Sequence, residues 1–231
     1  MKSKILVFSY LLIILISPLF ADNKNISVET GYVSRYIWRG FDLIPDNYDA
    51  IQPSITYTFG ETGFWINFFS SFGIKERTNT KFADELDCSI GCDKMIFKKS
   101  VTVSIGLAYY TFPHLEGKNT TPEIFANFIF LKSQYSPILT VYYDMNMGDG
   151  FYILSSISRT IEPLPLSFGI SLGYNNNQYI EDSGISDIIF SSSYELTISQ
   201  VTLTPTIYYA YIPMDEVNNE NEFWTSIKIT F

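Results

Sequence analysis

Apolar and polar residues alternate along most of the chain after about residue 25. In the stretch 51–59, for example, Ile51, Ile55 and Tyr57 fall on one side and Gln52 and Thr56 on the other. A two-residue period is that of a β-strand with one apolar and one polar face. Runs of this kind recur between turn residues and predict about twelve strands, at Ile26–Arg39, Ile51–Phe59, Phe64–Phe72, Glu85–Asp93, Val101–Phe112, Glu123–Phe130, Ile138–Asp144, Phe151–Thr160, Leu166–Tyr174, Asp187–Glu195, Val201–Tyr211 and Glu222–Phe231.

The connections between these runs alternate between short and long. Gly60–Gly63 and Ile161–Pro165 are short, whereas the long ones are Gly40–Asp49, Ile74–Asp84, Pro113–Pro122, Asn175–Ser186 and Ile212–Asn221. Short periplasmic turns and longer extracellular loops are typical of outer-membrane barrels. We therefore predict an all-β fold, a closed antiparallel transmembrane β-barrel with meander topology. A soluble periplasmic β-sandwich shows the same alternation with its apolar faces turned inward, and it is the alternative.

The start of the chain has the order of a secretory signal peptide. Lys2 and Lys4 precede an apolar run that contains Pro18 and ends at Ala21. We predict a cleaved signal peptide at 1–21, followed by an outer-membrane barrel at 22–231, in the cell outer membrane of a Gram-negative bacterium. A retained anchor is the alternative, but the run is short for a helical span of roughly 20 residues.

The last strand ends the chain on an aromatic residue. Its apolar face carries four residues that we interpret as an outer-membrane assembly signal, namely Phe223, Ile227, Ile229 and Phe231. The expected partners are therefore outer-membrane lipid and the barrel-assembly machinery. An ordinary edge strand that ends in phenylalanine is the alternative.

Composition narrows the classes of function. The chain has 231 residues, with 24 acidic and 15 basic ones, for a formal net charge of -9. That charge argues against nucleic-acid binding, which requires a basic surface. The 17 Tyr and 19 Phe favour strands over helices. No segment after Ala21 is apolar enough for a helical span, so the mature chain would have to enter a membrane as strands.

The polar faces would carry charged residues into the barrel lumen. The predicted charge cluster consists of Glu29, Arg35, Arg39, Glu85, Asp87, Glu123, Asp144 and Asp187. Arginine suits two-point contact with carboxylates, so the cluster is either a structural network of ion pairs or a constriction that favours cations. Small hydroxyl residues such as Ser167, Ser191, Ser193, Thr204 and Thr206 fill other polar positions, as suits a solvated or tightly filled interior.

No catalytic residue, metal site or cofactor is predicted. His114 is the single histidine and is interpreted as a solvated loop residue, because no Gly-x-Ser-x-Gly motif accompanies it. Cys88 and Cys92 are about 13 Å apart on one strand, beyond disulfide reach. The segment Asp144–Gly150 has the start of a calcium loop, but Ser155 stands where a bidentate Glu is required, so a tight turn is preferred.

Clustered aromatic residues admit two interpretations. They are interface belts where they face outward, or sugar-stacking platforms. The residues are Tyr109, Tyr110, Tyr142, Tyr143, Tyr208, Tyr209, Tyr211, Trp38, Trp65 and Trp224.

The stretch 31–40, GYVSRYIWRG, followed by Gln52-Pro53-Ser54, resembles the opening of the Gcw-chp family of uncharacterised bacterial outer-membrane proteins. Glu85, Asp87 with Gly91, Glu123 and Asp187 match that family's acidic strand positions, while Cys88 or Cys92 stands where tyrosine is expected. The resemblance implies a barrel and no known activity.

The function expected from these observations is a small pore or transport-related channel for an unknown small solute or ion. A structural or surface-interaction barrel that acts through its extracellular loops is the main alternative. An outer-membrane enzyme is a further one.

Overall fold

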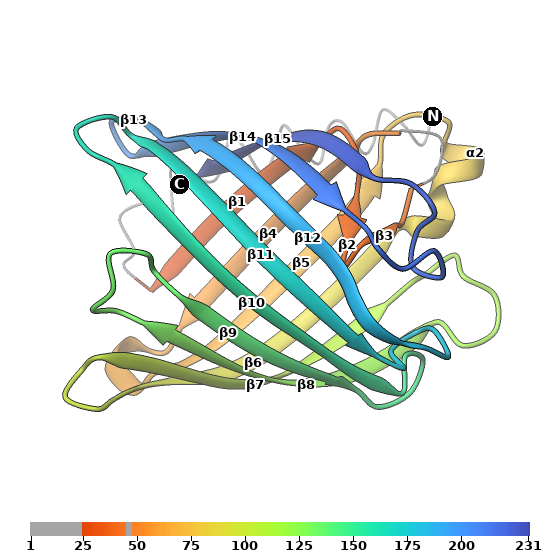
Figure 1. The fold of residues 1–231 in the computed structure, drawn as a ribbon, viewed down its shortest axis with the longest axis horizontal. Helices are drawn as coiled ribbons and strands as arrows, with labels where there is room; N and C mark the ends of the chain where they lie inside the picture. The colour runs from red at the N-terminus through yellow and green to blue at the C-terminus, as the bar shows by residue number, and fades with distance from the viewer. Residues whose placement is uncertain (1–24, 45–47) are drawn as a thin grey trace.

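The computed structural model describes residues 25–44 and 48–231, so the expected signal peptide at 1–21 lies outside the described residues. Twelve long antiparallel strands close into a tilted barrel (Figure 1). Long strands that follow one another in the sequence pair with each other. The pairing of β1 with β15 joins the first strand to the last and closes the barrel, and β14 continues the order to β12. The predicted meander barrel is confirmed, with strands β1 Ile26–Val33, β4 Ala50–Thr58, β5 Phe64–Gly73, β6 Glu85–Ile96, β7 Val101–Thr111, β8 Thr120–Phe130, β9 Ile138–Asp144, β10 Gly150–Ile161, β11 Leu166–Asn176, β12 Ser183–Tyr194, β14 Val201–Tyr211 and β15 Glu222–Thr230.

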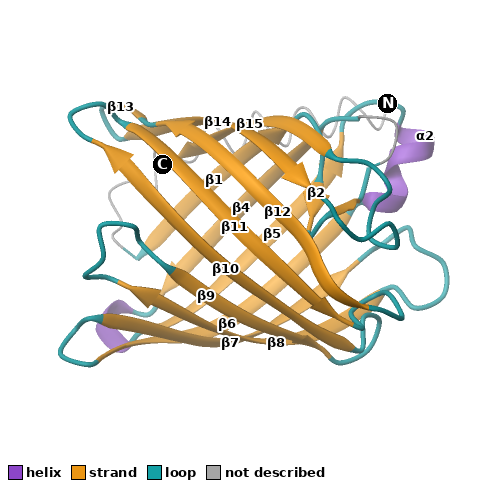
Figure 2. Cartoon of the chain, viewed as in Figure 1, coloured by secondary structure: helices purple, strands orange, loops and turns teal. Residues whose placement is uncertain are grey.

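The faces of the strands are arranged opposite to those of a soluble sandwich. Apolar side chains such as Ile55, Phe68, Ile90 and Ile207 point outward and are 40–52% exposed. The polar face of each strand turns into the lumen, where hydroxyl and charged side chains gather. Figure 2 shows the barrel wall as one sheet with loops at both ends. Among the described residues, the other sheet consists of two strands of two residues each, too small to cover the apolar faces. The sandwich alternative is therefore excluded.

The two ends of the barrel differ. At the terminal end, where β1 begins and β15 ends, the connections are short: 59–63, 97–100, 131–137, 162–165 and 195–200. The last of these carries β13 (Leu196–Ile198), which extends the edge of β14. At the loop end most connections are longer: 34–49, 74–84, 112–119, 145–149, 177–182 and 212–221. The predicted alternation of lengths thus holds with two exceptions: the loop-end connections 145–149 and 177–182 have five and six residues, fewer than the seven of 131–137 at the terminal end.

In the described ranges 25–44 and 48–231, the short helical segments lie outside the barrel wall. They are η2 (Gly60–Thr62), α2 (Arg77–Thr80) and η3 (Lys81–Ala83). Within the described residues, no helix has the length and the apolar character needed to cross a bilayer.

The prediction for the first strand is wrong at its C-terminal end. The alternating pattern predicts a strand that reaches Arg39, but β1 ends at Val33 and the chain then folds inward. Two short strands, β2 (Ile37–Trp38) and β3 (Phe41–Asp42), form a separate hairpin. The turn residues are Arg39 and Gly40, with φ of 53° and 88°. Positive φ at both central residues is the geometry of a two-residue hairpin turn, and it breaks the alternation that the sequence continues into this segment.

Candidate functional site

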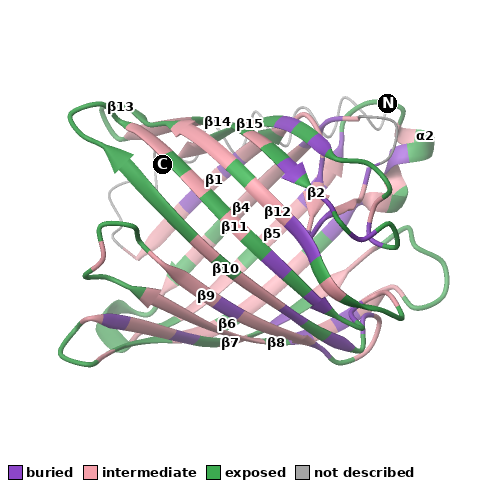
Figure 3. Cartoon of the chain, viewed as in Figure 1, coloured by how far each residue is buried: buried purple, intermediate pink, exposed green. Residues whose placement is uncertain are grey.

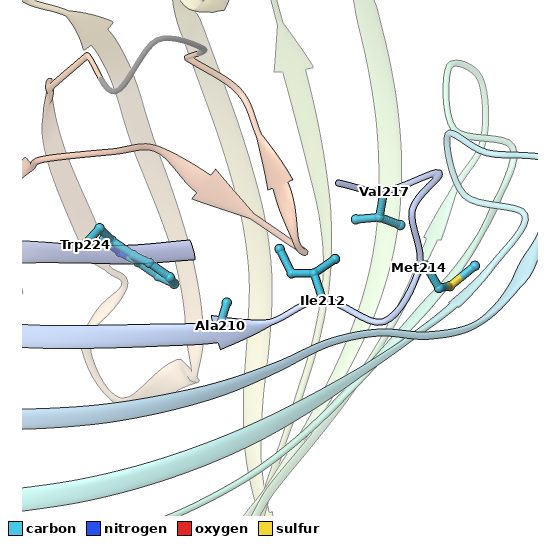
Figure 4. Packing of buried hydrophobic residues seen from close by; sticks show 5 residues of the cluster. All are labelled: Ala210, Ile212, Met214, Val217 and Trp224. Atoms are coloured by element: carbon cyan, nitrogen blue, oxygen red, sulfur yellow. The ribbon is translucent and has the colours of Figure 1, made fainter. Parts of the chain in front are cut away.

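The β2–β3 hairpin lies across the barrel mouth at the loop end. On one side, Ile37 and Phe41 pack against a buried apolar cluster contributed by β14, β15 and their connecting loop, shown in Figure 4 and composed of Ala210, Ile212, Met214, Val217 and Trp224. On the other side, the Tyr36 hydroxyl donates a 2.6 Å hydrogen bond to Glu85 at the start of β6. Buried residues are concentrated at this end of the barrel (Figure 3). The hairpin is therefore held from opposite walls.

Arg39 at the hairpin tip forms the central ion pair. Its two terminal nitrogens donate to the two carboxylate oxygens of Glu123, on β8, at 2.6 and 2.8 Å. The side chains of Arg39 and Glu123 are 6% and 0% exposed. Glu123 also accepts from Tyr110 at 2.8 Å and from Gln178 at 3.2 Å. A forked contact with further donors is the geometry in which a buried pair can offset its loss of hydration.

Aromatic rings enclose the Arg39 guanidinium. Its central carbon lies 4.2 Å from the ring centroids of Trp38 and Tyr142 and 4.9 Å from that of Tyr152. Burial lowers the pKa of Arg39, but the hydrogen bonds and charge of Glu123 outweigh it and raise the pKa above its ordinary value. The guanidinium therefore remains cationic inside a ring of π faces, where cation–π attraction is strongest.

Neighbouring residues fix the partners of Arg39. Asn175 both accepts from the Gln178 backbone N–H, at 2.8 Å, and donates to its carbonyl, at 2.9 Å, which holds the Gln178 side chain toward Arg39. At Gly40 a Cβ would lie 2.7 Å from Val217 and 3.3 Å from the Ser186 carbonyl. Glycine is needed there both for the positive φ and for the close approach of the loop.

The predicted charge cluster is brought together only in part. Arg39 pairs with Glu123, and Glu85, Asp87 and Asp187 lie around them on β6 and β12. Asp187 accepts from Tyr152 at 2.9 Å and from Ser186 at 2.7 Å. These residues form one group below the mouth.

The other three predicted members have other partners, although Asp144 on β9 lies directly opposite Glu123. Arg35 pairs with Glu222 on β15, next to the hairpin. Glu29 lies near the terminal end, where Lys228 approaches it at 3.5 Å. The Asp144 carboxylate accepts from the Asn146 and Gly148 backbone N–H groups at 2.9 and 2.8 Å. It thus closes the tight turn that the sequence favours over a calcium loop.

Sequence reasoning missed several partners at the mouth. Glu222 and Gln178 complete the two arginine contacts, and Tyr36, Tyr110 and Tyr152 supply phenolic donors to buried carboxylates. Gln178 lies in a connection and the tyrosines look like other strand aromatics, so no local pattern distinguishes them. The one available signal is Arg39 beside Gly40, an arginine at a turn position that usually takes Asn, Asp or Gly.

Half of the lumen below the mouth is filled by aromatic rings. Trp65, Phe125, Tyr142 and Tyr152 follow one another from β5 to β10, with successive ring centroids 6.1, 6.3 and 6.1 Å apart. Gly91 on β6 leaves the space that the Trp65 ring occupies, and Gly106 on β7 does the same for Phe125. We call this group the aromatic column. It leaves the opposite half of the lumen open.

The open half is a cavity of about 750 Å³. Its lining runs from Arg35, Tyr36 and Ile37, under the hairpin, to Glu29 and Lys228, whose side chains are 38% and 51% exposed near the terminal end. Its walls come from β10, β11, β12, β14 and β15 on one side and from β1, β4 and β5 on the other. The cavity is therefore closed by the hairpin at one end and reaches solvent toward the other.

The remaining candidate residues are His114 and the two cysteines. His114 is 46% exposed and lies 3.4 Å from Asp84, a carboxylate that Arg77 already holds with both of its terminal nitrogens. Asp84, the acidic neighbour of His114, thus belongs to an ion pair within a loop. Cys88 and Cys92 are free thiols on β6, which confirms that they are not linked to each other.

Solved structures of outer-membrane porins and of one outer-membrane enzyme share this fold. The KdgM porin superposes with a TM-score of 0.60 at 9% identity, over 89% of this chain and 98% of that one. The NanC porin gives 0.52 at 15% identity, over 89% and 97%. Outer membrane phospholipase A from Escherichia coli gives 0.53 at 11% identity, over 89% and 92%. The chain is thus a twelve-stranded barrel of the porin-like architecture, and at these identities the likeness concerns the fold alone.

The sequence itself identifies the family. Residues 21–187 match the model of a bacterial protein family of unknown function, Gcw_chp. The match covers more than half of the chain, so the chain belongs to this family, as the resemblance of its first strand and loop indicates. Among curated proteins, no sequence matches it.

Proposed function

We propose that this protein is an outer-membrane channel for small polar solutes, closed at its extracellular end by the β2–β3 hairpin. The observation that carries the proposal is the cavity of about 750 Å³, which runs through one half of a closed barrel and ends under the hairpin. A polar bore inside an apolar outer surface is the arrangement of a diffusion channel in lipid. The fold shared with the KdgM and NanC porins supports the same class.

The hairpin acts as a plug in this proposal. It contacts the barrel through Arg39 with Glu123 on β8, Tyr36 with Glu85 on β6, and Arg35 with Glu222 on β15, so it cannot leave the bore without breaking contacts on three strands. Residues at the tip of an inward-folded loop can be released together when one central contact fails. We infer that Arg39 is the contact on which the closed state depends most.

A variant without the plug tests the channel. Val33 and Ala50 are cross-strand partners in β1 and β4, so residues 34–49 can be replaced by a two- to four-residue Gly/Asn turn without disturbing the register. We expect this variant to give steady conductance in planar bilayers and the full chain to give rare openings. Heat-modifiable gel mobility verifies that both barrels are folded. Two folded but silent proteins would contradict the channel.

The outer-membrane location and the route to it belong to the same proposal. We infer export by a signal peptide at 1–21 and assembly through the terminal face of Phe223, Ile227, Ile229 and Phe231. Of these, Phe223 and Ile227 point outward and are 59% and 47% exposed. Phe231→Ala should reduce the folded, membrane-associated fraction, while the whole chain should resist extraction by carbonate or urea. Release of the protein by carbonate alone would exclude membrane insertion.

An enzyme is the competing function, because one protein with this fold is a phospholipase. Lipase and protease assays of the wild type and of His114→Ala distinguish the two. Activity that His114→Ala abolishes would favour the enzyme, and its absence in both leaves the channel. A second prediction is that the charge cluster makes the channel prefer cations. Reversal-potential measurements test it by comparing the plug-free variant with the same variant carrying Asp87→Asn.

A further inference from the structure

We propose that the lumen cavity binds uncharged, hydroxyl-rich solutes, meaning simple sugars and polyols, in preference to charged ones. The inference rests on the channel proposed above and names its solute class. It follows from the hydroxyl groups on one cavity wall, from the pairing of the charges beside them, and from an aromatic stack next to the hairpin.

The hydroxyl wall extends across consecutive strands in register. Ser193 on β12 faces Thr206 on β14, which in turn faces Ser226 on β15. Ser156 on β10 and Ser171 on β11 form a second, separate pair, because Ser171 faces Ile189 of β12 and not Ser193. Adjacent strands lie about 4.8 Å apart, so the row on β12, β14 and β15 offers a donor and acceptor at regular intervals along the wall. The vicinal hydroxyls of a sugar or polyol match an array of this kind.

These hydroxyl groups are available to a ligand. Among the described residues, the side chains of Ser156, Ser171, Ser193, Thr206 and Ser226 make no hydrogen bond to another side chain or to the backbone, although all of them line the cavity. Their oxygens face the cavity, so a solute that can both donate and accept hydrogen bonds can replace the water that solvates them.

The charges at the cavity are paired. Its charged lining residues among those described are Glu29, Arg35 and Lys228. Glu29 and Lys228 approach each other at 3.5 Å, and Arg35 pairs with Glu222. No sign of charge is left in excess along the path. An ionised solute would lose hydration there without gaining an opposite charge, whereas a neutral solute would avoid that cost.

An aromatic stack lies at the hairpin end of the same wall. The Tyr208 and Trp224 rings are parallel within 8°, with centroids 4.8 Å apart, and both line the cavity. Such rings offer an apolar face together with a polar edge, which suits the C–H face of a sugar ring flanked by hydroxyls. The cavity volume of about 750 Å³ lies within the range of small-molecule pockets, roughly 300–1,000 Å³.

Three probes of one ring size test the proposal on the full chain in detergent. Galactose, galacturonate and galactosamine differ mainly in charge, and equilibrium dialysis measures the binding of each. We expect saturable binding of galactose and at least tenfold weaker binding of both charged analogues. Galacturonate or galactosamine binding as tightly as galactose would overturn the proposal, and so would the absence of galactose binding.

A variant locates the binding at the hydroxyl wall. Thr206→Val with Ser226→Ala removes two adjacent hydroxyls at nearly constant volume, and we expect galactose binding to weaken at least fivefold. Thr197→Val, on the exposed β13 outside the barrel, is the matched control and should bind as the wild type does. An unchanged double variant would refute the site; if that variant does not fold, the three-probe comparison still decides.

Binding and conduction can fail separately. Galactose binding by a protein whose plug-free form stays silent would disprove the channel and leave the binding site. Conductance in the plug-free form without preference among the three probes would leave the channel and disprove the solute class.

Discussion

Replacing Arg39 with alanine should open the barrel. The substitution leaves Glu123 buried at 0% exposure with its two guanidinium hydrogen bonds gone. Removing one partner of a buried ion pair typically costs about 3–5 kcal/mol. Since every 1.4 kcal/mol is a factor of ten, the ratio of open to closed plug should rise by about 10²- to 10³-fold or more.

Single-channel recording in planar bilayers measures this ratio as the open probability. Lys75→Ala is the matched control, because Lys75 pairs at 3.3 Å with Asp49, near the end of the same loop, but with its side chain 68% exposed. An exposed pair of this kind contributes only about 0–1 kcal/mol, so the control should change the open probability less than about fivefold.

The double variant Arg39→Ala with Glu123→Ala separates the pair from its surroundings. Because the two residues act as one unit, their effects on the closed state should be far from additive. The double variant should destabilise the closed state much less than the sum of the two single variants does. An open probability of Arg39→Ala within threefold of the wild type, in barrels shown to be folded, would refute the assignment of the hairpin as the plug.

Three further outcomes are expected. Gly40→Ala should also raise the open probability, because its Cβ would lie 2.7 Å from Val217 at a φ of 88°; an unchanged record would contradict the tight seating of the turn. Burial and the neighbouring Glu85 raise the pKa of Tyr36 well above about 10, so the closed state holds this proton more firmly than a released loop does. Closure should therefore persist below pH 10 and weaken above it, and Tyr36→Phe should reduce that dependence in bilayer recordings. Ile207→Lys places a charge on the outer face, where Ile207 is 52% exposed, and should destabilise the barrel by about 2–4 kcal/mol in urea titrations in lipid; equal stability would argue that this face does not meet lipid.

The wall of the barrel could be predicted from the sequence because alternation is a local signal. Ile138–Asp144 and Val201–Tyr211 are predicted at their observed bounds, and most other strands within a few residues. Each side chain's position in the alternation decides whether it faces the lumen, and on this basis Glu85, Asp87 and Glu123 are predicted as lumen residues; Glu85 and Glu123 are buried in the structure. The turn lengths add the closure and the meander order.

The plug could not be predicted in the same way. The alternating pattern continues through Ser34, Tyr36 and Trp38, so it predicts a longer first strand than β1 is. What ends the strand is tertiary: Arg39 finds Glu123 and Gln178 across the bore, and these partners lie 84 and 139 residues away in the chain. Within the local sequence, the Arg39–Gly40 turn is the feature that indicates this arrangement.

Because of the aromatic column, the open path through the barrel is narrower than the number of strands alone would indicate. Trp65 and Phe125 do not line the cavity and occupy lumen space beside it, so the width of the open path depends on a few rings as well as on the circumference. A homologue with a leucine at either position would keep the same twelve-stranded frame yet admit bulkier molecules. Size exclusion in this architecture can therefore evolve by one substitution, independently of the closure at the mouth.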